Sequence, residues 1–209
     1  MNPNSPRLLI APIEEEEALQ GRVTPEDLLR ANSFGSPRRR AEYLSWRAAL
    51  YGLLQKRCSP LYNAMGAPLL PEGWGWIGVS HGRELVALIY SSHRPVAIDI
   101  ESSDRPYRSL SPRFLSPNEE ALSQEALWPG IAWSAKEVLY KISGCEGLDF
   151  RRDLHLDRLS WPTTSCSKVD PLSPKNEITP EGVIEGRVKD CPHLLGFSLF
   201  EGGWVVWTL

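Results

Sequence analysis

Apolar residues repeat at helical spacing in the segment 131–143, IAWSAKEVLYKIS. Its stripe at i, i+3, i+4 and i+7 is made of Ala135, Val138, Leu139 and Ile142. This pattern predicts a helix with one buried face, ended by Gly144. Glu137 and Lys141 lie one turn apart on a different face. Taken alone, such a pair is most often an exposed ion pair of about 0.3–0.5 kcal/mol.

A second helical pattern runs through SPRRRAEYLSWRAALYGLLQKR, residues 36–57. Its apolar stripe is Tyr43, Leu44, Ala48, Tyr51 and Leu54. Arg39, Arg40 and Arg47 lie on or just before this predicted helix. Cations near a helix N-terminus do not favour helix formation, because they oppose the helix dipole. The segment therefore indicates either an anionic ligand or a solvated basic face, and the two interpretations stay equally open.

Three short runs rich in Val and Ile follow, at 75–80, 84–91 and 95–101. Short turns separate them, so the pattern predicts an antiparallel meander of three strands. In the third run the side chains alternate between the two faces, with isoleucines on one side and carboxylates on the other: Ile98 and Ile100 against Asp99 and Glu101. If the carboxylate face were open to water, it would carry no function.

The remaining segments complete a mixed architecture. A strand is expected at 8–13, a helix after Ser116, a strand near 150–159, a long surface connection at 160–181 and a closing hairpin. The order of elements predicts an α+β fold with two similar lobes, 1–104 and 105–209. Each lobe is expected to lay a helix on a small antiparallel sheet, with the active site at the interface between the lobes.

Composition narrows the class of protein. The 209 residues are 42% hydrophobic and 23% charged, with a net charge of −3, which predicts a globular chain without general attraction to nucleic acid or anionic membranes. No apolar run approaches the ~18–20 residues of a membrane span, and no secretory leader is evident. Four cysteines without CxxC spacing indicate reduced thiols in a cytoplasmic protein: Cys58, Cys145, Cys166 and Cys191.

The candidate chemistry begins with three carboxylates. Asp99 and Glu101 share a strand face, and Glu137 joins them if the helix at 131–143 packs over that strand. Oxygen ligands of this kind suit Mg²⁺, which binds a few carboxylates together with substrate phosphates. No His/Cys cluster favours zinc. Nearby cations for phosphate oxygens are Lys136, Lys141 and His81.

Each motif is weak alone, but their order is specific. Ser80-His81 comes first, then the strand ending in Asp99-Ile100-Glu101, then RFLSPNE at 113–119, then WSAKEVLYK at 133–141. This series resembles the 4′-phosphopantetheinyl transferase superfamily, and specifically its larger, two-lobed branch, which activates carrier proteins. The resemblance covers about residues 38–155.

The resemblance implies a function. The enzyme is expected to be a transferase of the holo-acyl-carrier-protein synthase type. It would move the 4′-phosphopantetheine of coenzyme A to a serine hydroxyl of an apo acyl or peptidyl carrier protein, with Mg²⁺ as cofactor and adenosine 3′,5′-bisphosphate released. Two fused lobes also imply a monomer, and neither nucleic acid nor membrane is expected as a partner.

The resemblance further implies roles by position. Metal ligands would be Asp99, Glu101 and Glu137. Catalytic residues would be Glu137, which helps deprotonate the serine, and Lys141, which neutralises charge on the pyrophosphate. Coenzyme A phosphates would be contacted by a wider set: Ser80, His81, Arg40, Arg47, Lys136 and Lys141. Basic residues for docking the carrier would come from Arg108, Arg113, Arg151 and Arg152.

The sequence also departs from the family pattern. Gly66-Ala67-Pro68 stands where the family usually has Gly-Lys-Pro, Gly82 replaces the serine that commonly follows Ser-His, and Ala97 replaces the glycine before the acidic triplet. A non-catalytic relative that binds coenzyme A is therefore the alternative hypothesis. An unrelated metal-dependent phosphohydrolase ranks last, because it has no motif of its own here.

Overall fold

The structure is a computed structural model that describes residues 5–161 and 178–209. Part of the expected surface connection at 160–181, together with Cys166, lies outside the described residues. Helices and strands mix along the chain and all strand pairs are antiparallel, which confirms the expected α+β class. Within the described residues, no helix is both long and apolar enough to traverse a bilayer.

Three helices and five strands precede the acidic strand: β1 (Arg7–Pro12), α1 (Glu16–Leu19), α2 (Pro25–Asn32), α3 (Pro37–Leu54), β2 (Leu61–Tyr62), β3 (Pro68–Leu69), β4 (Trp76–His81) and β5 (Leu85–Ser91). From the acidic strand onward the elements are β6 (Ile98–Ser102), α4 (Tyr107–Leu110), the 3₁₀ helix η1 (Ser111–Arg113), α5 (Pro117–Glu120), α6 (Trp128–Ser143), β7 (Leu154–Ser160), β8 (Gly182–Val188), β9 (Cys191–Phe200) and β10 (Gly203–Thr208). The strands form a three-stranded sheet β1-β5-β4, a five-stranded sheet β6-β10-β9-β8-β7 and the small hairpin β2-β3.

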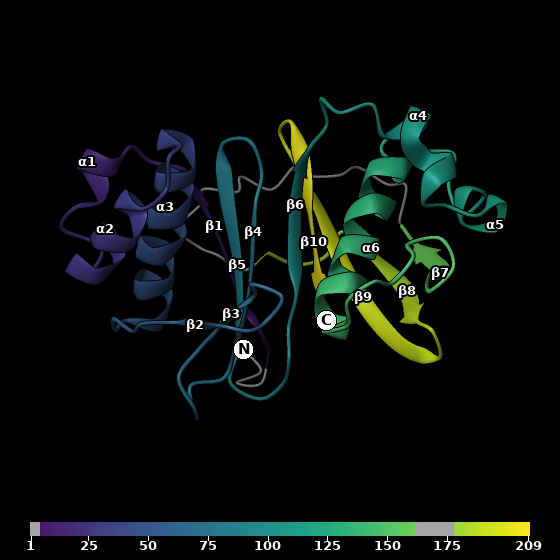
Figure 1. Cartoon of the computed structure of the whole chain (residues 1–209). Helices are drawn as coiled ribbons and strands as arrows, with labels where there is room; N and C mark the ends of the chain where they lie inside the picture. The colour runs from purple at the N-terminus through teal and green to yellow at the C-terminus, as the bar shows by residue number, and fades with distance from the viewer. Residues whose placement is uncertain (1–4, 162–177) are drawn as a thin grey trace.

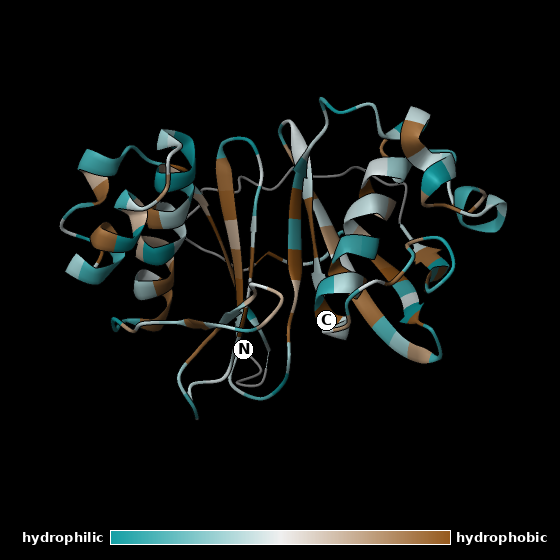
Figure 2. Ribbon diagram, viewed as in Figure 1, coloured by the Kyte–Doolittle hydropathy of each residue, from teal (hydrophilic) through white to brown (hydrophobic). Residues whose placement is uncertain are grey.

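The two larger sheets and their helices form layers, with α1–α3 beside the three-stranded sheet and α6 beside the five-stranded one (Figure 1). One core cluster joins α3 to β4 and β5, and another joins α6 to β7–β10. A third cluster lies between the sheets, where Leu8, Ile10, Ala87 and Ile89 meet Ile98, Ile100, Val205 and Trp207. Hydrophobic residues accordingly concentrate on the central strands and on the inward sides of the helices (Figure 2).

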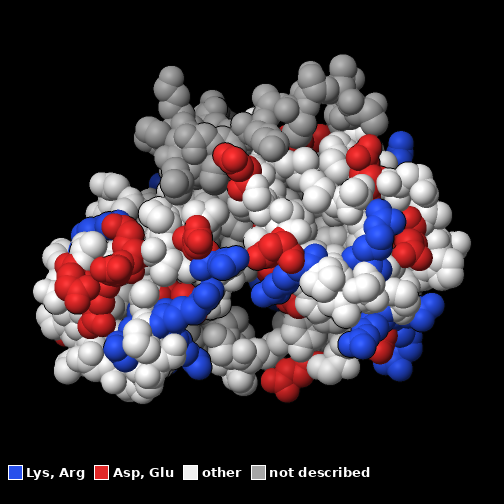
Figure 3. Space-filling view, turned by 90° about the horizontal axis from the view of Figure 1, so that it is seen from above, with Lys and Arg blue, Asp and Glu red and all other residues white. Residues whose placement is uncertain are grey.

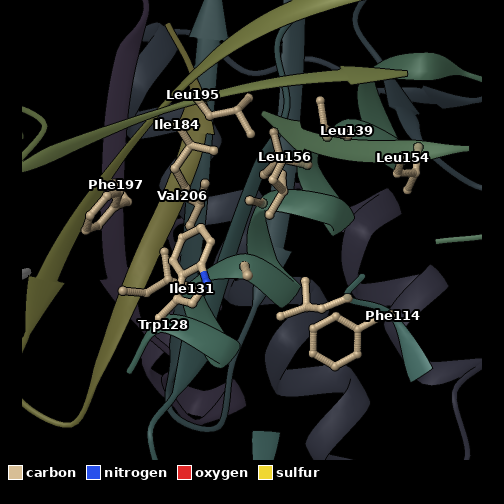
Figure 4. Packing of buried hydrophobic residues seen from close by; sticks show 14 of the residues in the cluster. Phe114, Trp128, Ile131, Leu139, Leu154, Leu156, Ile184, Leu195, Phe197 and Val206 are labelled. Carbon is tan, nitrogen blue, oxygen red and sulfur yellow. The ribbon is translucent and has the colours of Figure 1, made fainter. Parts of the chain in front are cut away.

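The core around α6 is built mainly from branched side chains and large rings. Trp128 is 1% exposed, Ile131, Leu139 and Phe197 are fully buried, and they gather between the helix and the sheet (Figure 4). The Trp128 indole also donates a hydrogen bond of 2.9 Å to Glu119 O, which ties the segment before α6 to the helix. This packing fixes which side of α6 faces β6, and therefore where the polar face of the helix points.

The expected meander is wrong in its third strand. β4 and β5 pair as expected, but β6 pairs with β10, placing Asp99 opposite Val206. The connection from β5 to β6, residues 92–97, is too long for a two-residue hairpin turn and contains Pro95, so it lets the chain leave the sheet. The division into 1–104 and 105–209 stays a prediction, because β6 from the first part pairs with β10 from the second.

The expected alternation along β6 is confirmed, but its polar face is not open to water. Ile98 and Ile100 are buried between the sheets, whereas Asp99 turns to the α6 side and is only 5% exposed. Gly78 lets β4 approach β6 closely, because a Cβ at this position would lie 3.1 Å from Ala97 Cα. The neighbouring edges of the two sheets thus meet beneath α6.

Candidate active site

Asp99 is the centre of the site. Its Oδ1 accepts hydrogen bonds from Ser80 Oγ at 2.9 Å and from Lys141 Nζ at 2.7 Å. Its Oδ2 is buried and has no hydrogen-bond partner. An unpaired carboxylate oxygen in the interior is costly, because it has lost its hydration without replacing it. This oxygen is therefore available to bind a cation or to accept a hydrogen bond.

Lys141 joins three elements at this point. It lies in the last turn of α6, where a cation is favoured by the helix dipole. Its Nζ donates to Asp99 Oδ1, to Ile98 O at 3.0 Å and to Ser80 Oγ at 3.3 Å. The side chain remains 32% exposed, so the ammonium is fixed in place and still reaches solvent.

Glu137 and Glu101 face the same region. Burial raises the pKa of Glu137, and the negative charges of Asp99 and Glu101 raise it further, while Lys141 opposes them. Burial and the charge of Asp99 likewise raise the pKa of Glu101, while Arg105, 3.0 Å from its Oε1, opposes them. Because the charge of Asp99 acts on both glutamates, the three acids expected from the sequence share one electrostatic environment.

The donor set fits a hard divalent cation. A bound Mg²⁺ would offset the repulsion that raises the pKa values of Glu101 and Glu137, and it would give the unpaired buried oxygen of Asp99 a partner. Among residues 5–161 and 178–209, however, no three His, Cys, Asp or Glu side chains already converge closely enough to hold a metal ion. Binding one ion would require glutamate side chains to turn toward Asp99. The shared metal site of Asp99, Glu101 and Glu137 therefore stays a prediction.

A cleft of about 580 Å³ opens beside Lys141, between α3, the β2-β3 hairpin, β4 and the end of α6. Its aromatic wall is made of Phe34, Tyr43, Trp46, Tyr62 and Tyr140. Three permanent cations line it, Arg30, Arg39 and Lys141, against one carboxylate, Glu42, among the described lining residues. From above, a hollow lies between the two halves of the molecule with charged side chains around it (Figure 3). The cleft suits a ligand with both a flat apolar part and anionic groups.

His81 lines this cleft, as expected for a residue that contacts the ligand. Its side chain is 54% exposed, and its Nε2 lies 3.8 Å from Glu42 Oε2. The preceding Ser80 is 6% exposed, does not line the cleft, and directs its hydroxyl to Asp99 instead. The structure therefore separates the two residues of the Ser-His pair into a cleft residue and an orienting residue.

Besides Ser80, three expected ligand contacts are not brought to the cleft. Arg40 Nε lies 3.3 Å from Glu16 Oε2, and its Nη1 donates to Phe34 O at 3.0 Å. Arg47 is 3% exposed and lies 3.2 Å from Asp27 Oδ1. Neither side chain belongs to the lining of the cleft, so the structure does not support either as a phosphate contact.

Lys136 is the third, and its position corrects the expected role. It is fully buried, and its Nζ donates to Phe114 O at 2.7 Å and Phe150 O at 2.8 Å and lies 2.7 Å from Glu119 Oε1. Burial lowers the pKa of Lys136, while Glu119 opposes this effect. Lys136 thus fastens the segment before α6 to the helix, and phosphate cannot reach it.

Sequence reasoning missed Arg30 as a cleft residue and gave Arg39 no specific role. A signal for Arg39 was present, since Arg39, Glu42, Tyr43 and Trp46 follow i, i+3, i+4 and i+7 on α3 and all line the cleft. Arg30 comes from α2, and its Cζ lies 4.7 Å from the centroid of the Tyr62 ring. No sequence pattern indicates that α2 approaches the β2-β3 hairpin.

The structure combines a mixed α+β fold with a buried aspartate that is bound by a lysine beside a cation-lined cleft, an arrangement suited to phosphorylated ligands. Comparison with known families makes this specific, since residues 95–179 match the model of the 4′-phosphopantetheinyl transferase superfamily. The match confirms the resemblance to this superfamily of transferases over residues 95–179. It includes Asp99, Glu101, Glu137 and Lys141. Among curated proteins, none matches the chain.

Proposed function

We propose that the protein transfers the 4′-phosphopantetheine group of coenzyme A to a serine hydroxyl of an apo acyl or peptidyl carrier protein, with Mg²⁺ as cofactor. The proposal includes the two-lobed branch of the superfamily and the holo-acyl-carrier-protein synthase type of activity. The observation that carries it is Asp99, held by Lys141 and Ser80 through one oxygen while the other has no partner. The family match over the same residues supports the choice of reaction.

Asp99, Glu101 and Glu137 would hold Mg²⁺, which supplies positive charge against the pyrophosphate oxygens when bound. The residues of the chain do the remaining work. Lys141 is fixed by three acceptors and presents its ammonium where charge on the pyrophosphate grows. Ser80 holds Asp99 in orientation, because its hydroxyl donates to the oxygen that Lys141 also contacts.

Glu137 is the proposed general base. The serine oxygen of the carrier attacks the β-phosphorus of coenzyme A and gives its proton to Glu137. A new phosphorus–oxygen bond forms to serine, and the bond to the oxygen bridging the α-phosphate breaks. The electron pair of the broken bond leaves with adenosine 3′,5′-bisphosphate, so atoms and charge balance.

Coenzyme A is proposed to bind in the cleft of about 580 Å³. His81, Arg39 and Arg30 would face its anionic groups, while the aromatic wall would pack on the flat base. The pyrophosphate would lie at the Lys141 end, next to the three carboxylates. This arrangement requires no other cofactor, and we further propose a cytoplasmic monomer.

The direct test is intact-mass spectrometry of apo carrier proteins incubated with coenzyme A and Mg²⁺. A carrier heavier by one phosphopantetheine is expected, and its absence with acyl and peptidyl carriers alike would overturn the proposal. Glu137→Ala should lose most of the activity, by about 10²-fold or more if it acts as the base. Coenzyme A binding without Mg²⁺ dependence and without transfer would instead favour a non-catalytic relative.

A further inference from the structure

A buried ion pair lies behind the aromatic wall of the cleft. Arg47 of α3 and Asp27 of α2 are 3% and 4% exposed, and Arg47 Nε lies 3.2 Å from Asp27 Oδ1. The pair is extended by Tyr43, whose hydroxyl accepts a hydrogen bond of 3.0 Å from Arg47 Nη2 and donates one of 3.3 Å to Asp27 Oδ1. Arg47, Asp27 and Tyr43 thus form a closed triangle in the interior.

The guanidinium of Arg47 also lies close to three rings that line the cleft. Its Cζ is 4.4 Å from the ring centroid of Trp46, 5.1 Å from that of Tyr43 and 5.9 Å from that of Tyr62. Tyr62 comes from the β2-β3 hairpin, whereas the other two rings come from α3. One buried cation therefore contacts the wall where two elements distant in sequence meet.

The opposite end of the ion pair is anchored in α2. Asp27 Oδ2 accepts hydrogen bonds from Thr24 Oγ1 at 2.9 Å and from Thr24 N at 3.1 Å, which completes the capping box of the helix. It also accepts one of 2.6 Å from Tyr51, whose pKa is raised by burial so that the hydroxyl stays a donor. Asp27 cannot shift without disturbing α2 and α3.

This arrangement is a poor way to gain stability. A buried ion pair often contributes no more than apolar side chains of the same volume. Arg47 Nε and Nη1 are in addition buried without a hydrogen-bond partner, which is a further cost. What the planar guanidinium does provide is a fixed platform against which Tyr43, Trp46 and Tyr62 are held.

We infer that Arg47, anchored by Asp27, is a positioning residue for the coenzyme A cleft, which it affects through Tyr43, Trp46 and Tyr62 without touching the ligand. The inference rests on the proposed function of this cleft. It assigns Arg47 to the affinity for coenzyme A and not to the chemical step. Arg47 contacts the aromatic wall of the cleft, and its described interactions include neither Asp99 nor Lys141.

The test removes both charges together, because removing Arg47 alone would leave Asp27 buried and unpaired. In the double variant Asp27→Asn, Arg47→Met, KM and the directly measured Kd for coenzyme A are expected to rise about tenfold, while kcat stays within about twofold. The single variant Arg47→Lys keeps the charge but loses the planar group, so its Kd for coenzyme A should lie between those of the wild type and the double variant. Isothermal titration calorimetry gives Kd and thermal unfolding reports folding.

The matched control is the other buried pair, replaced as Glu119→Gln, Lys136→Met. It has comparable burial but lies away from the cleft, so Kd for coenzyme A should not change. An unchanged Kd in the folded Asp27→Asn, Arg47→Met protein would overturn the inference, as would an equal rise in the control. If the wild type binds coenzyme A but transfers nothing, the proposed function fails while the Kd comparison still decides the role of Arg47. If the wild type binds no coenzyme A, both fail.

Discussion

Asp99 combines two properties that are hard to reconcile in a residue kept for stability. One of its oxygens is bound by Lys141 and Ser80, and the other is buried without a partner beside two further carboxylates. Such a group raises the energy of the folded protein unless a cation arrives. The arrangement fits the proposed site, which a bound cation would complete.

The consequence can be tested with Asp99→Asn. We expect transfer activity to fall by about 10²-fold or more, because the charge that would hold Mg²⁺ and fix Lys141 is gone. We also expect the melting temperature to stay equal or rise, because the repulsion with Glu101 and Glu137 is removed. Activity by intact mass and unfolding by calorimetry would be measured on the same sample. A variant that is both active and destabilised would contradict this account of Asp99.

The two lysines of α6 lead to opposite predictions. Lys136→Met should destabilise the protein by about 3–5 kcal/mol, since Glu119 would remain buried and unpaired. Lys141→Met should abolish most of the transfer activity and cost less stability than Lys136→Met, because this ammonium is 32% exposed and Ser80 still donates to Asp99. Urea unfolding and the transfer assay separate the two effects. Adding Glu119→Gln to Lys136→Met should restore much of the lost stability, and failure to do so would argue against the pair as the cause.

The sequence already contained the signal that distinguishes these lysines. Ala132, Ala135, Lys136 and Leu139 follow i, i+3, i+4 and i+7, and all four are buried, so the helical period places Lys136 on the core face. It entered the expected ligand set through its position beside Glu137 and through the family motif WSAKEVLYK. Residues one position apart on a helix do not face the same way. The correction therefore follows from spacing, not from proximity in sequence.

At the scale of elements, α3 and α6 could be predicted closely and β6 could not. The helices follow from a period that is local to the chain, and their observed bounds, Pro37–Leu54 and Trp128–Ser143, agree with the expected segments. The partner of β6 is β10, which lies about a hundred residues further on. A strand carries information about which face is buried but not about which distant strand will pair with it.

The β2-β3 hairpin provides a test at this scale. Its Tyr62 pairs with Pro68 next to Ala67, and Arg30 lies over the Tyr62 ring without an ion-pair partner among the described carboxylates. Arg30→Ala should weaken coenzyme A binding about five- to tenfold, because the cleft loses one cation. Ala67 lines the same cleft, so adding Ala67→Lys should restore most of the affinity. Titration calorimetry measures both.

The matched control for this pair is Arg57→Ala. Arg57 is an exposed arginine that donates to Gly21 O and does not line the cleft, so its removal should not change Kd. If Arg57→Ala weakens binding as much as Arg30→Ala does, the effect comes from net charge and not from position.

For the molecule as a whole, stability should depend on pH in two opposite ways. The pKa values of Glu101 and Glu137 are raised above the ordinary 4.5, so the folded state takes up protons more readily than the unfolded chain. Their contribution to the free energy of unfolding should therefore rise as pH falls from neutral toward 4.5, while His193, whose pKa is lowered by burial, opposes it. Burial alone would raise the pKa of Glu119, but hydrogen bonds from Lys136 and two backbone N–H groups lower it overall. The stability that Glu119 contributes is therefore present above pH 4.5 and is lost at lower pH.

Urea unfolding at a series of pH values in the absence of divalent cations measures these two opposite contributions to the free energy of unfolding. In the double variant Glu101→Gln, Glu137→Gln the free energy of unfolding should depend less on pH above pH 4.5. In Glu119→Gln it should depend less on pH below that value. If the Glu101→Gln, Glu137→Gln variant and the wild type show the same pH dependence between pH 7 and 5, the raised pKa values are contradicted.

The strand β6 has a further consequence for how the chain reaches its native state. Its isoleucines belong to the layer between the two sheets, and its carboxylates belong to the reactive side. Shifting its pairing with β10 by one residue would exchange the two sets and bury Asp99 and Glu101 in a dry interface. The alternation that places the carboxylates on the α6 side therefore also disfavours mispaired folding intermediates. Correct pairing of β6 with β10 and formation of the proposed site are then one event.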